Sequence, residues 1–219
     1  MRRYGVVAVE VKICGITRVE DAAAAVAAGA DWLGVVFAGG PRLVDAARAG
    51  LIVEAAGGRP VMGVFATQST DEILHLCDRC GLAGAQLHGD YTTDDALGLS
   101  ANGLTVWRVM RLAGADDLAG LPSMAAGADA VLVEPRLRNV QGGGGIALSL
   151  ALAAHARRRF DGRLVLAGGL RPDTVAQAVG LVRPDAVDVS SGVEILPGIK
   201  DSQKIEQFVE AVRGLSPVA

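Results

Sequence analysis

The sequence predicts a single (β/α)8 barrel that spans residues 1–219. Short runs rich in β-branched residues alternate with amphipathic, alanine-rich segments, and this alternation repeats eight times without a linker or a shift in composition. Barrels of this class usually take about 250 residues, so a chain of 219 suits one barrel without large insertions. An open doubly wound sheet is the competing fold, but it would carry a G-x-G-x-x-G fingerprint after its first strand, where this chain has Cys14-Gly15-Ile16-Thr17.

The expected strands are mostly apolar at consecutive positions, which is typical of a parallel sheet with both faces covered by helices. Several begin after a turn with a glycine, such as Gly29 or Gly127, because glycine readily adopts the left-handed conformation that ends a helix. The expected strands are 9–14, 31–37, 60–65, 83–87, 104–109, 129–134, 163–167 and 184–189. The expected helices are 19–29, 45–57, 70–81, 92–101, 115–126, 146–159, 172–180 and 201–213.

Composition and charge argue against several classes of protein. The net charge of −3 and the isoelectric point near 5.6 argue against a general affinity for nucleic acid or acidic lipid. No apolar run reaches the roughly 18 residues of a membrane span. The three cysteines, Cys14, Cys77 and Cys80, form no disulfide framework, and Cys77 and Cys80 lie within a helical pattern with no second pair to complete a metal site. We therefore expect a cytoplasmic protein.

Polar residues and glycines gather directly after the expected strands. In barrels of this fold the active site is built at these carboxyl ends, whereas the opposite end contributes stability. The residues concerned are Cys14, Arg42, Gln86, His88, Arg108, Glu134, Gly168, Gly169, Asp188, Ser190, Ser191 and Gly192.

The loops after the seventh and eighth strands predict a phosphate site. Gly168 and Gly169 follow one strand, and Ser191 and Gly192 follow the next. Phosphate sites of this fold form from these two loops, where glycines let backbone N–H groups approach the anion. One pair of glycines could merely turn the chain, but two such loops on adjacent strands favour phosphate binding. A phosphate ligand restricts the class of substrate and leaves the reaction open.

The residues that could perform acid–base chemistry each allow two interpretations. Cys14 is either a small buried hydrophobe or a base, and a base would need an electropositive setting from Lys12 and helix N-termini. Glu134 ends an apolar strand, where a carboxylate is either solvated at the rim or functional. Asp188 lies within a strand expected to be buried, so it requires a partner or a function. His88 either binds ligand or hydrogen-bonds backbone at a strand end.

Ordered motifs from residue 11 to about 208 resemble the phosphoribosylanthranilate isomerases, a family of tryptophan biosynthesis. The first and last of them are specific, whereas the glycine runs alone would not be. The matching stretches are 11–17 (VKICGIT), 63–65 (GVF), 86–89 (QLHG), 142–145 (GGGG), 166–170 (LAGGL), 187–194 (VDVSSGVE) and 197–201 (PGIKD).

The resemblance implies an Amadori rearrangement of N-(5-phosphoribosyl)anthranilate to the 1-deoxyribulose 5-phosphate adduct. It places the general base on Cys14 and the general acid on Glu134, with Arg42 on the anthranilate carboxylate. Asp188 would position the substrate amine or the base, and His88 would also face the substrate. The reaction requires no cofactor, redox step or metal. The expected partner is the small phosphosugar substrate alone, with the protein a monomer or else a homodimer.

The chain departs from the family at several positions. Glu134 stands where the family usually has Asp, and Gly40 stands where a Ser is common before the Pro-Arg pair. The run 142–145 consists of four glycines, and 147–149 reads ALS where Phe-Asp-Trp is usual. These changes concern the acid and the anthranilate pocket, and they leave the phosphate loops intact.

Three rival functions are weighed against this interpretation. A dual-substrate isomerase serving the histidine and tryptophan routes would be expected to carry an Asp at the position of Cys14. A metal-dependent epimerase would need several converging ligands, yet only His88 of the three histidines lies at a strand end. A binding protein without catalysis would carry Glu134 as the mark of a decayed site.

Overall fold

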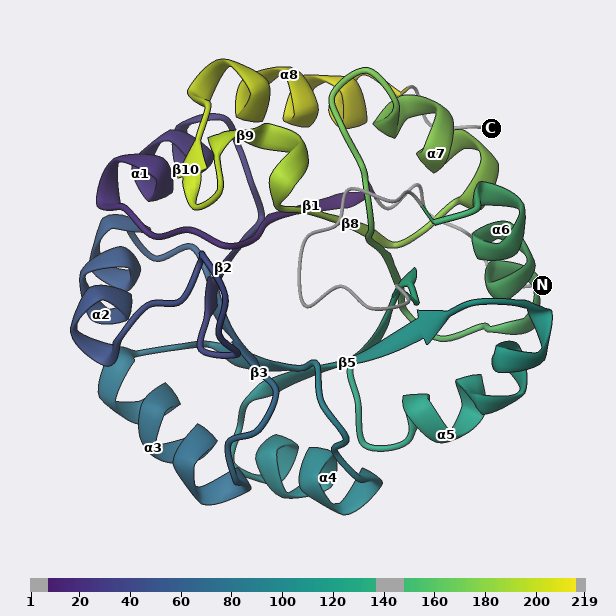
Figure 1. Cartoon of the computed structure of the whole chain (residues 1–219), viewed down its shortest axis with the longest axis horizontal. Helices are drawn as coiled ribbons and strands as arrows, with labels where there is room; N and C mark the ends of the chain where they lie inside the picture. The colour runs from purple at the N-terminus through teal and green to yellow at the C-terminus, as the bar shows by residue number, and fades with distance from the viewer. Residues whose placement is uncertain (1–7, 137–147, 216–219) are drawn as a thin grey trace.

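The computed structural model describes residues 8–136 and 148–215, and eight parallel strands close into a barrel in which β8 pairs with β1 (Figure 1). Each strand pairs with the next one along the chain, so the strand order is the chain order. The predicted fold and all eight predicted strands are confirmed. The strands are β1 Glu10–Ile13, β2 Trp32–Val36, β3 Val61–Phe65, β4 Gly84–Leu87, β5 Thr105–Leu112, β6 Ala130–Pro135, β7 Leu164–Leu166 and β8 Ala186–Val189.

Helices follow the strands and surround the barrel as an outer layer (Figure 1). They are α1 Val19–Ala27, α2 Ala46–Ala55, α3 Thr70–Cys80, α4 Thr93–Ala101, α5 Leu121–Ala125, α6 Leu150–Arg159, α7 Val175–Val182 and α8 Ser202–Arg213, with the 3₁₀ turns η1 Ala115–Gly120 and η2 Ser191–Val193. A short hairpin of β9 Glu194–Leu196 and β10 Ile199–Lys200 precedes α8 and lies near α1 (Figure 1). In the described part of the chain, no helix has the length and apolar character that crossing a membrane requires.

Several element boundaries differ from the sequence prediction, four of them by three residues or more or by a break within the element. The helix expected at 115–126 is split into η1 and α5, because Pro122 lacks the N–H group that would continue the first segment and suits the first turn of a new helix. The helix expected from 172 begins at Val175, and the one expected from 146 begins at Leu150, with 146–147 outside the described residues. The strand expected to end at 109 continues to Leu112, since β5 stays paired with β6 up to that residue.

The core has two parts. The larger cluster lies between strands and helices, and a smaller one containing Met62, Trp107, Leu132 and Val165 fills the barrel interior. Both sides of each strand are thus packed, which explains the continuous apolar runs in the sequence.

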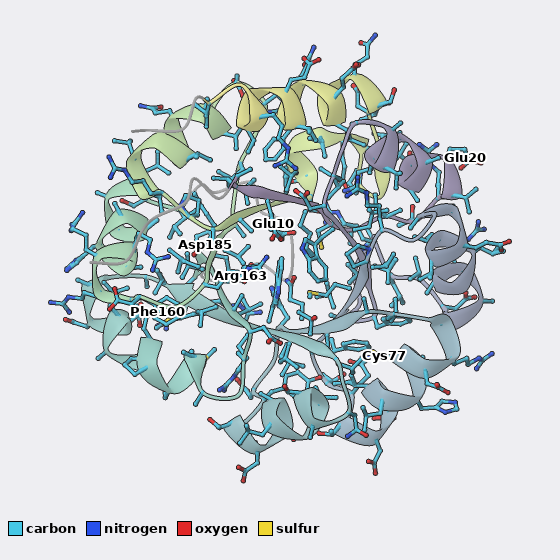
Figure 2. The ribbon with its side chains drawn as sticks, turned by 180° about the vertical axis from the view of Figure 1, so that it is seen from behind. Glu10, Glu20, Cys77, Phe160, Arg163 and Asp185 are labelled. Carbon is cyan, nitrogen blue, oxygen red and sulfur yellow. The ribbon has the colours of Figure 1, made fainter. Side chains whose placement is uncertain are left out.

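Charged side chains close the end of the barrel where the strands begin. Asp185 accepts a hydrogen bond of 2.7 Å from the Leu164 N–H group, and Arg163 forms an ion pair with Glu10. Glu10 also accepts a 2.7 Å hydrogen bond from the indole of Trp32. Figure 2 shows Glu10, Arg163 and Asp185 close together near the barrel axis. These contacts link the starts of different strands, in keeping with a structural role for this end of the barrel.

Candidate active site

The loops after β7 and β8 meet around one pocket of about 370 Å³. Gly169, Ser191 and Gly192 line it, together with Lys204 and Gln207 of α8. The two loops are in close contact, since a Cβ atom on Gly192 would lie 1.9 Å from the carbonyl oxygen of Leu170. Only glycine fits there, and the same approach exposes backbone at the pocket wall. The structure thus brings together the loops from which the sequence predicted a phosphate site.

The loop after β7 also depends on glycine for its backbone conformation. Gly168 and Gly169 have φ angles of 89° and 75°, a region that glycine enters without steric cost. A Cβ atom on Gly168 would lie 2.2 Å from Cδ of Pro135, so this loop packs directly on the end of β6. The loop that ends β7 therefore lies between the pocket and the strand that carries Glu134.

Cys14 lies at the end of β1 and is 6% exposed. Its N–H group donates to the Val189 carbonyl at 2.8 Å, which fixes the residue against β8. Burial raises the pKa of the Cys14 thiol, the charge and hydrogen bond of Lys12 act in the opposite direction, and the charge of Asp188 adds to the increase. The electropositive setting expected for a base is therefore offset by burial and by Asp188, and this arrangement favours the thiol.

Lys12, two residues before Cys14, is completely buried. Its Nζ donates to Oδ1 of Asp188 at 2.8 Å and to Oε1 of Gln86 at 2.9 Å. Lys12 and Asp188 are register partners across the β1–β8 pair, which explains why the two side chains meet. Asp188 is 9% exposed, as the strand prediction required, and Lys12 is the partner that a buried carboxylate needs.

Arg42, in the loop between β2 and α2, is held by a buried carboxylate. Its Nε and Nη2 donate to the two oxygens of Glu194 at 2.8 and 2.7 Å, a bidentate geometry. Lys200 also donates to Glu194, at 2.8 Å. Burial opposes ionisation of Glu194, but the hydrogen bonds and charges of Arg42 and Lys200 bring its pKa below the usual value. Among the described residues, Nη1 of Arg42 has no hydrogen-bond partner, so a carboxylate ligand could still bind there.

Gly15 makes room for this arrangement. Its φ angle is 72°, and a Cβ atom there would lie 2.5 Å from Cδ of Arg42 and 2.8 Å from Oγ of Ser190. The glycine that follows Cys14 thus lets Arg42 pass beside the end of β1.

Glu134 lies at the carboxyl end of β6 with His88 and Arg111. Its Oε1 accepts hydrogen bonds of 3.0 Å from Nε of Arg111 and from Nε2 of His88. Nη2 of Arg111 lies 2.7 Å from Nδ1 of His88; since arginine can only donate, Nδ1 accepts and the ring hydrogen is on Nε2. Burial opposes ionisation of Glu134, but His88 and Arg111 together lower its pKa.

Sequence reasoning missed several residues of the site. Arg111 was missed because β5 was expected to end before it. Glu194 and Lys200 were missed because the sequence does not show that the segment containing them lies against Arg42. Lys204 and Gln207 lie in a helical pattern that does not reveal which face meets a pocket. The Glu-Ile-Leu-Pro-Gly-Ile-Lys segment 194–200 carried the available signal, because Pro197-Gly198 marks a turn between two short runs.

A sequence model of the family described as N-(5'phosphoribosyl)anthranilate (PRA) isomerase matches residues 11–211. The chain belongs to this family. The phosphoribosylanthranilate isomerases are aldose–ketose isomerases, and the enzymatic activity inferred from the sequence motifs is confirmed as the activity of this family.

Similar proteins cover nearly the whole chain. An N-(5'-phosphoribosyl)anthranilate isomerase of Pseudomonas aeruginosa is 43% identical over 208 residues, which are 94% of this chain and 96% of the relative. The crystal structure of phosphoribosyl anthranilate isomerase from Thermotoga maritima has a TM-score of 0.85 at 34% identity and covers 94% of this chain and 100% of its own. A crystal structure of a phosphoribosyl anthranilate isomerase in complex with reduced 1-(o-carboxyphenylamino)-1-deoxyribulose 5-phosphate has a TM-score of 0.82 at 33% identity, with the same coverage.

Within the phosphoribosylanthranilate isomerase fold, the site residues described above form four groups. The first is the pocket between the loops after β7 and β8, and the second contains Cys14 with Lys12 and Asp188. The third contains Arg42 with Glu194 and Lys200, and the fourth contains Glu134 with His88 and Arg111. The glycine run 142–145, which we expected beside the acid, lies outside the described residues.

Proposed function

We propose that this chain performs its family's Amadori rearrangement with Cys14 as the general base and Glu134 as the general acid. The acid protonates the ribose ring oxygen and opens the ring to a Schiff base. The base then removes the proton from C2, and the resulting enolamine tautomerises to the ketone. No electron leaves the substrate, since the oxidation of C2 to a ketone is balanced by reduction at C1.

The observation that carries the proposal is the placement of Cys14. The thiol lies at the carboxyl end of β1, next to β8, whose following loop lines the pocket with Ser191 and Gly192. A phosphate bound by the N–H groups of 168–169 and 191–192 would anchor the ribose at this edge of the barrel. The sugar would then extend from the phosphate pocket toward Cys14.

Glu134 needs a proton to serve as an acid, and its surroundings limit where that proton can reside. Both of its hydrogen bonds fall on Oε1, and Oε2 accepts none from the described residues. The proton would be carried by Oε2 and handed to the ring oxygen. Because Arg111 and His88 favour the carboxylate, substrate binding would have to raise the pKa of Glu134, for example by excluding water from the pocket.

The remaining residues would bind and orient the substrate. Arg42, fixed by Glu194, would offer Nη1 to the anthranilate carboxylate. His88 would hold Glu134 in place and face the substrate, and Asp188 would position Cys14 through Lys12. We expect a cytoplasmic protein, a monomer or else a homodimer, that acts on this phosphosugar and requires no cofactor.

The proposal is tested by turnover and complementation. The purified protein should convert N-(5-phosphoribosyl)anthranilate to the deoxyribulose adduct, and its gene should restore growth without tryptophan to a bacterial strain that lacks the isomerase. A protein that binds the reduced product but neither turns over nor complements would be a binding protein, and the proposal would be wrong.

A further inference from the structure

Lys12 is a buried cation that the proposed function uses only as the link between Asp188 and Cys14. Its side chain is 0% exposed, and its Nζ lies 5.7 Å from the centroid of the Trp107 ring, inside the barrel. An ammonium group has three hydrogens to donate. Asp188 and Gln86 accept two of them, and no other described oxygen accepts the third.

Cys14 and Lys12 share one space beside β2. A Cβ atom on Gly34 would lie 2.9 Å from the sulfur of Cys14 and 3.1 Å from Nζ of Lys12. The sulfur and the ammonium nitrogen are therefore within about 6 Å of each other, the range in which an opposite charge shifts a pKa. Any residue larger than glycine at position 34 would fill this space.

Stability alone gives no reason for a charged residue at this position. A buried ion pair is weak evidence for stability, because well-packed apolar side chains of similar volume usually stabilise a core at least as well. The Lys12–Asp188 pair lies beside a thiol that must lose its proton in the proposed reaction. This position gives Lys12 a role in balancing the negative charge that forms on the sulfur.

We propose that Lys12 is a positioning residue whose ammonium group is the counter-ion of the Cys14 thiolate. The inference rests on the proposed role of Cys14 as the base. While Cys14 is a thiol, Asp188 neutralises Lys12. When the thiol proton leaves to solvent, the thiolate forms an ion pair with the Lys12 ammonium group and accepts a hydrogen bond from its third hydrogen. The thiolate then removes the C2 proton and becomes a thiol again.

A comparison of the charged groups around Cys14 supports this assignment. Lys12 lies on the same strand and Asp188 on β8, while Lys200 of β10 and Arg42 complete the charged surroundings. Burial raises the pKa of Cys14 most, Lys12 opposes it most strongly, and Lys200 opposes it less. Lys200 donates to Glu194 and to two oxygens of Ser190, and Arg42 is held by Glu194, whereas Lys12 keeps one hydrogen that no described oxygen accepts.

The inference is tested by the pH dependence of Cys14 alkylation with iodoacetamide, followed by mass spectrometry of the Cys14 peptide. Only the thiolate reacts, so the midpoint of the rate profile reports its ionisation. Lys12→Met should raise the midpoint by at least about one pH unit, which is a tenfold slower reaction at neutral pH. Asp188→Asn should lower it, because the competing anion is removed. Cys77, which burial holds at a pKa of about 12, is the internal reference and should not respond.

A purely structural role for Lys12 would leave the Lys12→Met midpoint at the parent's value, whatever Asp188→Asn does, because the charge of Asp188 itself raises the pKa of Cys14. A Lys12→Met midpoint that equals the parent's overturns the inference, and so does an Asp188→Asn midpoint that is unchanged or higher. If Lys12→Met fails to fold, Lys12→Gln, which keeps a hydrogen-bond donor without the charge, replaces it and should raise the midpoint in the same way; an unchanged Lys12→Gln midpoint overturns the inference. The readout does not depend on turnover. Opposite shifts together with an active Cys14→Ser enzyme would therefore contradict the proposed function and leave the Lys12 assignment standing.

Discussion

Replacing Glu134 by Gln removes the proton that the proposed acid must donate and keeps the length of the side chain. Both donors to this residue, Nε of Arg111 and Nε2 of His88, bind the same oxygen at 3.0 Å. The amide oxygen of Gln can accept both hydrogen bonds, so the substitution should preserve the cluster. The variant therefore isolates proton transfer from the shape of the pocket.

The expected loss is at least about 10² in kcat, the lower range for a general acid, which corresponds to about 2.7 kcal/mol in the activation barrier. KM should change little, because the interaction removed belongs to the transition state. The affinity for the reduced product should also remain, because the proposal assigns its binding to phosphate and carboxylate contacts away from Glu134.

Glu134→Asp restores the family's usual residue and should give intermediate activity. The strand cannot follow the shorter side chain, since Arg111 and Glu134 are register partners in the β5–β6 ladder. The carboxylate withdraws by about 1.5 Å, one C–C bond, and the 3.0 Å hydrogen bonds to Arg111 and His88 must lengthen unless both side chains move. Misplacement by about 1 Å costs up to roughly 10² in rate.

Steady-state kinetics of both variants beside Asp188→Asn decide the assignment. We expect the parent to be faster than Glu134→Asp, and Glu134→Asp to be faster than Glu134→Gln. If Glu134→Gln turns over like the parent while Asp188→Asn is inactive, Asp188 is the acid and the reasoning about Glu134 is wrong.

Three further predictions follow from the geometry. Gly169→Asp should weaken binding of the reduced product, measured by calorimetry, by at least about tenfold relative to Gly169→Asn. The Asn side chain has to adopt the same φ angle of 75° but carries no charge, so it is the matched control. Equal affinities of the two variants would place the phosphate elsewhere. Glu194→Gln should loosen Arg42 and raise KM by about tenfold with a smaller change in kcat, whereas an unchanged KM would remove Arg42 from the carboxylate site. Despite burial, His88 and Arg111 lower the pKa of Glu134, so its carboxylate stabilises the fold at neutral pH and loses this effect as the pH falls through the lowered pKa. Urea unfolding should show Glu134→Gln less stable than the parent at neutral pH, and the difference should shrink steadily as the pH is lowered; a difference that does not change with pH would contradict this.

The sequence was sufficient to predict the barrel because local patterns determine it. Each strand is a short apolar run buried on both faces, and each is followed by a segment with helical periodicity. The meeting of the loops after β7 and β8 could be predicted for the same reason: Gly168-Gly169 and Ser191-Gly192 lie at fixed positions after adjacent strands, and the fold brings those positions together. That these loops bind phosphate stays a prediction.

Contacts between distant strands could not be predicted in this way. Glu194 accepts a hydrogen bond from Arg42, which lies 152 residues earlier in the chain, and Lys12 donates hydrogen bonds to Gln86 and Asp188 on two other strands. Periodicity shows that Asp188 is buried, but its partner depends on the β1–β8 register, which follows from closure of the barrel. Arg111 joins Glu134 only because β5 continues to Leu112, beyond the apolar run that marked it.

The turnover number of Cys14→Ser tests the central claim most directly. Serine nearly preserves the size of the side chain, but its hydroxyl is far too weakly acidic to form a base beside Lys12 at neutral pH. The account predicts that the variant folds, binds the reduced product like the parent and shows no measurable conversion of N-(5-phosphoribosyl)anthranilate. Conversion at close to the parent's rate would contradict the assignment of Cys14 as the base.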